Sequence, residues 1–121
     1  MSNPRPHMDF DDIRRAAHML GQKRRDARRD YERYMEQSAD ADRDYRKALA
    51  IAFAEWKAKD GVTAAQAEIA AHAAAADHKH KRDLSSALAK SCLLRIEELE
   101  ADRAMLRQLG DWSQRIAGVA A

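Results

Sequence analysis

The longest stretch of this chain without strong helix breakers runs from Asp9 to Lys59, where proline is absent and Gly21 is the only glycine. Apolar and aromatic residues recur in it at intervals of three and four, which is the period of an amphipathic α-helix. The positions on this face are Ile13, Ala17, Leu20, Arg24, Ala27, Tyr31, Tyr34, Ser38, Ala41, Tyr45, Ala48 and Ala52. Ten of these twelve are apolar or aromatic. The pattern therefore predicts one long helix over residues 9–59, with a packing seam along it.

A short turn is expected after this helix, at Asp60–Thr63. Gly61 suits a helix C-cap, because glycine readily adopts the left-handed conformation that ends many helices. Thr63 and Gln66 have the spacing of a capping box, which predicts the start of a new helix. Nine alanines in residues 64–76 indicate a helix that packs close to its neighbour. This helix is either a separate short element or the first turns of the last helix.

A second long helix is predicted over about residues 77–116, with Asp77 as a candidate N-cap. Its expected seam consists of Leu84, Leu88, Cys92, Arg95, Leu99, Asp102, Leu106, Leu109, Ser113 and Ile116. Residues 1–8, which contain both prolines, are expected to form a flexible lead-in. Residues 9–121 are then a single helical domain.

Two long helices joined by a short connection are expected to pack as an antiparallel hairpin. Because a hairpin buries only one face of each helix, the remaining apolar residues need a second copy of the chain. We therefore expect an all-α fold in which long hairpins, each with an Ala-rich connecting segment, assemble into a helical-bundle or coiled-coil homo-oligomer. The residues assigned to the oligomer interface are Leu88, Leu94, Leu99, Met105, Leu106, Leu109 and Trp112.

The sequence contains no pattern typical of a catalytic, metal or cofactor site. His78 and His80 point to different sides of a helix, and His72 lies six residues before His78, so these histidines lack ligand spacing. Cys92 is the only cysteine, which excludes an intrachain disulfide and suits a reducing compartment. No apolar run approaches the roughly 20 residues that span a bilayer. These features predict a non-enzymatic cytoplasmic protein that binds no metal and no membrane.

Cations are unevenly distributed along the chain. Between Arg14 and Arg33 there are eight Lys or Arg and three acidic residues, although the formal net charge of the whole chain is only +2. Such a stripe favours nucleic acid, because Lys and Arg release its condensed counterions. The alternative is a solvated helix face, neutralised in part by nearby acids. A second cluster, His78–Arg82, lies at the predicted start of a helix, where cations oppose the helix dipole. The candidate nucleic-acid-binding residues in these two clusters are Lys23, Arg24, Arg25, Arg28, Arg29, Arg33, Lys79, Lys81 and Arg82.

The segment Tyr45–Phe53 with the turn Asp60–Thr63, and the later stretch Leu106–Ser113, resemble small phage proteins related to the UvsY recombination mediators. The resemblance covers about residues 44–113. It rests on the order of features: an Ala- and Lys-rich helix end, a glycine turn, an Ala-rich connection and a long C-terminal helix. It implies an oligomeric protein that binds single-stranded DNA and helps to load a RecA-type recombinase onto DNA covered by single-strand-binding protein.

The chain departs from this family near the end of the first long helix. Where the resemblance places basic DNA contacts, the chain has Ala50 and Ala52, and the basic residues only flank them: Arg46, Lys47, Lys57 and Lys59. Arg46 and Lys47 are kept as candidate nucleic-acid contacts. One of the two basic clusters is then expected to substitute. The leading hypothesis is a phage-type recombination mediator whose partners are single-stranded DNA and a RecA-type recombinase or single-strand-binding protein. The alternative is a small protein-binding inhibitor or structural adaptor, such as a phage anti-defence factor, without DNA binding.

Overall fold

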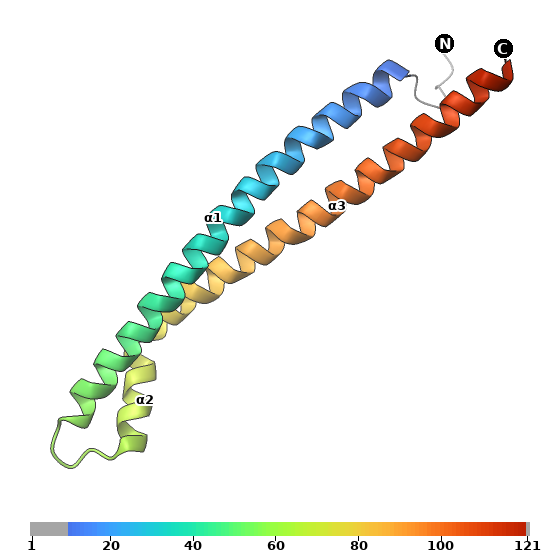
Figure 1. Ribbon diagram of the computed structural model, residues 1–121. Coiled ribbons are helices and arrows are strands. Elements are labelled where there is room, and N and C mark those ends of the chain that lie inside the picture. The colour runs from blue at the N-terminus through green and yellow to red at the C-terminus, as the bar shows by residue number, and fades with distance from the viewer. Residues whose placement is uncertain (1–9, 121) are drawn as a thin grey trace, which may run out of the picture. The chain divides into compact units, whose positions relative to one another are not determined.

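A computed structural model describes residues 10–120 of the chain, with side chains described through Gly118, and in this range the protein is all-α without a strand. Its helices are α1 (Phe10–Lys57), α2 (Ala64–Ala74) and α3 (Ala76–Ala120) (Figure 1). The expected lead-in over residues 1–8 and the expected helix start at Asp9 lie outside the described residues. None of the described helices is long and apolar enough to cross a membrane.

The chain divides into two compact units, and α1 and α3 contribute to both. One unit, called unit 2 below, is Asp30–Cys92 and contains the end of α1, all of α2 and the start of α3. The other, unit 1, consists of the chain up to Arg29 together with the chain from Leu93 onward.

The seam predicted for the first long helix is confirmed on α1. All twelve positions are buried or half-buried, from Ile13 to Ala52. Asp11 and Asp12 lie in the first turn and Lys57 in the last, as the helix dipole favours. The helix ends at Lys57, two residues before the expected end. A period of three and four that is apolar or aromatic at ten of twelve positions, with no proline and only Gly21 as a glycine, therefore predicts this helix correctly.

The turn between α1 and α2 combines a glycine turn with a capped helix start. The carbonyl of Lys59 accepts a hydrogen bond from the amide of Val62 at 3.4 Å, and Gly61 between them has φ +76°. Gly61 therefore lies in this turn, four residues after the end of α1, and is not the C-cap of α1. The predicted capping box is confirmed, because the Thr63 side chain accepts from the Gln66 amide while the Gln66 side chain accepts from the Thr63 amide.

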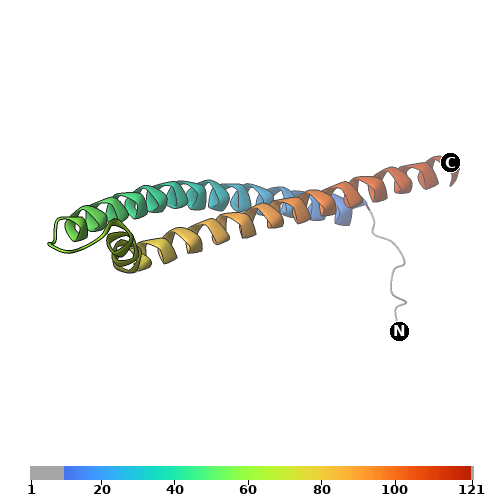
Figure 2. The ribbon, with the colours of Figure 1, turned by 90° about the horizontal axis from the view of Figure 1, so that it is seen from below.

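α2 is a separate element, since Ala75 is its C-cap and interrupts the helix before α3 begins at Ala76. The ribbon changes direction between α2 and α3 (Figure 2). The Ala75 amide donates to the carbonyl of Ala71, and the Ala75 carbonyl accepts from the amide of Lys79, each at 3.0 Å. The break thus falls before Asp77, which lies in the first turn of α3 instead of capping it. Ala67, Ala71 and Ala75 are at most 1% exposed. Their four-residue spacing places methyl groups on one ridge, which lets α2 approach its neighbours closely.

The seam predicted for the second long helix is wrong at six of its ten positions on α3, because Leu84, Leu88, Arg95, Asp102, Leu109 and Ile116 are exposed. Ser85, Ala89 and Ile96 are buried, whereas Leu84 and Leu88 are exposed. Cys92, Leu99, Leu106 and Ser113 are buried or half-buried, as expected. The observed seam consists of Ser85, Ala89, Cys92, Ile96, Leu99, Leu106, Gly110 and Ser113. The leucine pattern therefore predicted the wrong register over part of α3. Small residues occupy the buried positions of the seam, and the larger leucines lie beside them.

Candidate nucleic-acid interface

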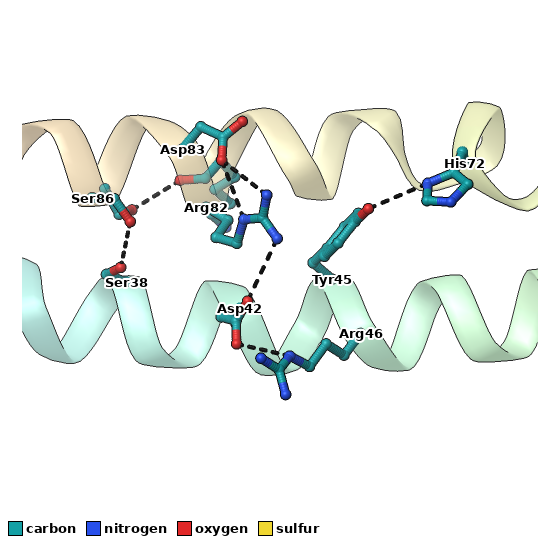
Figure 3. A network of polar contacts seen from close by, with 10 residues as sticks. Ser38, Asp42, Tyr45, Arg46, His72, Arg82, Asp83 and Ser86 are labelled. Atoms are coloured by element: carbon teal, nitrogen blue, oxygen red, sulfur yellow. Dashed lines mark hydrogen bonds and ion pairs between the residues drawn. The ribbon is translucent and has the colours of Figure 1, made fainter.

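Arg82, a candidate from the His78–Arg82 cluster, lies in a network of polar contacts in unit 2 (Figure 3). Its guanidinium donates to Oδ1 of Asp83 at 3.1 and 3.2 Å and pairs with Asp42 of α1 at 3.6 Å. It also covers the ring of Tyr45, 4.5 Å from the centroid. The hydrogen bond to Asp83, aided by the charges of Asp83 and Asp42, raises the pKa of Arg82. Arg82 is therefore engaged by its own chain.

Two hydroxyl contacts flank this arginine. The Tyr45 hydroxyl lies 3.4 Å from Nδ1 of His72 on α2, and the hydroxyls of Ser38 and Ser86 are 2.8 Å apart (Figure 3). Tyr45 is buried, so its hydroxyl gains a partner in place of lost water. As residue numbers rise on α1, the numbers of their α3 partners fall, so the two segments run in opposite directions within unit 2.

The other candidate cations of unit 2 fall into two groups. Arg33 pairs with Asp30 at 3.4 Å and lies 5.0 Å from the Tyr34 ring centroid, and Arg46 pairs with Asp42 at 3.0 Å. These charges are partly neutralised along their own helix. The remaining candidates are exposed and have no ion pair with any residue that the structure describes: Lys47, Lys79 and Lys81.

In unit 1, the basic stripe contains one structural arginine and several exposed cations. Arg24 lies on the seam, half-buried, and its Nη2 and Nε donate to Oε1 of Glu100 on α3 at 2.9 and 3.2 Å. Arg25, Arg28 and Arg29 are exposed and form no ion pair within the described part of the chain. Lys23 borders an apolar groove. The stripe thus presents three arginines whose charge is not offset by a contacting carboxylate.

The residues predicted for the oligomer interface do not share one environment. Leu99 is 6% exposed and Leu106 is half-buried, so both serve the seam of their own chain. The exposed members are Leu88, Leu94, Met105, Leu109 and Trp112. Three of them gather in unit 1, where Met105 and Leu109 line a groove of about 410 Å³ with Met19 of α1, and line a second of about 380 Å³ with Trp112. Unit 1 therefore carries a joint apolar surface, called here the methionine–tryptophan face.

A further groove in unit 1 was not suggested by the sequence. It has a volume of about 370 Å³, and Arg14 of α1 borders it together with Arg103 and Arg107 of α3. In the sequence, Arg103 and Arg107 lie in a segment that is net acidic, so the distribution of charge along the chain does not identify them as a basic cluster. Their i,i+4 spacing is the signal that places them on one side of a helix.

Among the described residues, no three His, Cys, Asp or Glu side chains are grouped so that they could hold a metal ion. His72 contacts Tyr45, and His78 and His80 are exposed on α3. Cys92 is a half-buried free thiol on the seam. No family model, no curated protein and no solved structure matches this chain.

Proposed function

We propose that this protein is a phage-type recombination mediator: an oligomeric helical adaptor that binds single-stranded DNA and helps to load a RecA-type recombinase. The observation that carries the proposal is the group Arg25, Arg28 and Arg29, which are exposed and have no ion pair in the described residues. Such guanidiniums release counterions when they meet phosphates, which is the main source of sequence-independent affinity. The resemblance to the UvsY-related mediators suggests the partners, a recombinase or single-strand-binding protein. The single cysteine suits the cytoplasm as the site of action.

The proposal includes an architecture for the whole chain. α1 and α3 form a long antiparallel hairpin joined by the Ala-rich segment, and copies of it assemble through the methionine–tryptophan face. In support, α1 residue numbers rise as those of their α3 neighbours fall within each unit. Ser38 and Asp42 contact Ser86 and Arg82 in unit 2, and in unit 1 Ile13 lies beside Gly110 while Arg24 pairs with Glu100. Met105 is 62% exposed and Trp112 is 52% exposed, so a second copy has apolar area to cover.

The DNA-binding proposal predicts a loss of affinity when the exposed arginines are reversed. The triple variant Arg25→Glu, Arg28→Glu and Arg29→Glu should bind a labelled oligothymidine much more weakly in fluorescence anisotropy. The slope of log K against log salt should fall by about 2, from three contacts of about 0.7 each. Helicity should be unchanged, because Glu and Arg have similar helix propensities and these positions are exposed.

A matched control reverses three exposed cations of α3: Lys90→Glu, Arg95→Glu and Arg115→Glu. It changes the net charge equally and should retain most of the affinity. Equal losses in both triples would mean that net charge alone governs binding. Wild-type protein that fails to bind at low salt would refute DNA binding and leave the protein-binding alternative.

The assembly proposal predicts that the wild-type chain sediments as a species larger than its 13.7 kDa mass at micromolar concentration. The double variant Met105→Glu and Trp112→Glu should move toward monomer, because it places charge on the face that a second copy covers. The control is Ile51→Glu with Ile69→Glu, which changes two exposed apolar residues of unit 2. Analytical ultracentrifugation compares all three proteins, and a monomeric wild type would contradict the proposal.

The same face favours one second candidate, a protein-binding inhibitor or structural adaptor without DNA binding. Methionine and tryptophan are enriched where proteins meet, since one adapts its shape and the other fills pockets. Met19, Met105 and Trp112 border the adjoining grooves of this face. This candidate requires a wild-type chain that does not bind single-stranded DNA. It also requires that the Met105→Glu and Trp112→Glu variant loses binding to a different protein, and not only association with a second copy of this chain.

A further inference from the structure

The groove bordered by Arg14, Arg103 and Arg107 in unit 1 brings together guanidiniums from two helices. All three residues are exposed, and none has an ion pair in the part of the chain that the structure describes. Asp111 is the one carboxylate among the residues lining the groove, so three positive charges face one negative charge there. An uncompensated group of guanidiniums is attracted to anions.

The floor of the groove is apolar. Ile13, Ala17 and Leu106 are half-buried along it, and Gly110 lacks a side chain where an added Cβ would lie 3.9 Å from Ile13 Cγ2. Phe10, which is 45% exposed, lies at one border. A basic rim over an apolar, partly aromatic floor is the composition of grooves that follow a single-stranded backbone while its bases contact apolar surface.

The groove also continues the basic stripe. Arg14, His18, Gly21, Arg25 and Arg28 follow one another at intervals of four and three, so they share one flank of the α1 seam. At 1.5 Å per residue, Arg14 and Arg28 lie about 21 Å apart along the helix. A row of this length suits a polyanion better than a single small anion.

From this placement we propose that the groove of Arg14, Arg103 and Arg107 holds phosphodiester groups of single-stranded nucleic acid, on a path that continues to Arg25 and Arg28. The inference rests on the proposed DNA-binding function and assigns it a site that includes α3. The planar guanidinium donates two parallel hydrogen bonds to phosphate oxygens, which suits each of these arginines to a phosphate contact.

The test is the double variant Arg103→Ala and Arg107→Ala, measured by fluorescence anisotropy with labelled oligothymidine over a salt series. Loss of two phosphate contacts should reduce the log–log salt slope by about 1.4. The matched control is Arg95→Ala with Arg115→Ala, two exposed arginines of α3 that do not border the groove. This control removes the same charge and should keep the wild-type slope. Circular dichroism should show equal helicity in all three proteins.

The outcomes separate this inference from the function on which it rests. Wild type that binds while the groove variant keeps both affinity and slope would refute the groove site and leave DNA binding intact. Wild type that does not bind at low salt would refute both. Inorganic phosphate added at constant ionic strength should displace no DNA. Displacement by phosphate would show a discrete anion pocket and would overturn the backbone path.

Discussion

Leu99→Asp is expected to destabilise unit 1 and to lower its free energy of unfolding by about 4 kcal/mol. Leu99 is 6% exposed on the seam of α3, so its side chain is almost fully removed from water. Burial of a leucine contributes roughly 1.5–3 kcal/mol, and the substitution loses this while it adds the cost of an unpaired charge in an apolar seam. Few other large side chains can compensate, because seven of the ten buried hydrophobic residues in the described part of the chain are alanines, and Ile96 and Leu99 are the only large aliphatic ones among them.

Urea unfolding followed by circular dichroism measures this loss. The control is Leu93→Asp on the same helix, where the side chain is 41% exposed and the aspartate stays in water. The control should cost no more than about 0.5 kcal/mol, the usual limit for surface substitutions. If both variants shift the urea midpoint equally, position 99 does not lie on the seam.

Ala67→Leu is expected to displace α2 and to lower the free energy of unfolding of unit 2 by about 1–3 kcal/mol. Ala67 is 0% exposed, and Ala71 and Ala75 continue its ridge along α2 into the bend. A leucine at this position adds three carbon atoms where the neighbours already lie in contact with a methyl group. Helix propensity does not account for the loss, because leucine is nearly as good a helix former as alanine.

Ala73→Leu is the matched control, since Ala73 is exposed on the same helix. It should leave the urea midpoint nearly unchanged. A stable Ala67→Leu protein would mean that α2 packs less closely than its buried alanines indicate.

The sequence predicts the helices well because their determinants are local. The seam of α1 was found from its apolar period alone, and the capping box at Thr63 from two residues. The register of α3 was harder to predict, because size and burial do not coincide there. Ser85 and Ala89 are buried, while Leu84 and Leu88 are exposed beside them. An apolar pattern cannot reveal that a close helix pair prefers small residues at its nearest positions.

The candidate site was less predictable, because residues far away in the sequence decide whether each basic side chain forms an ion pair. Arg24 and Arg82 belong to runs of similar basic residues, yet Glu100 engages the first and Asp42 the second from the other long helix. Arg25, next to Arg24, is exposed and has no such partner among the described residues. The groove of Arg103 and Arg107 appears only when α1 and α3 lie side by side in unit 1.

The division into two units gives each unit its own tryptophan. Trp56 belongs to unit 2, where the Lys59 ammonium lies 3.6 Å from its ring centroid, and Trp112 belongs to unit 1 on an apolar face. Indole emission depends on the polarity around the ring, so the two fluorophores report from different surroundings. Replacing either one by phenylalanine leaves a probe of a single unit. Two such proteins would reveal spectroscopically whether the units lose their structure together or in separate steps.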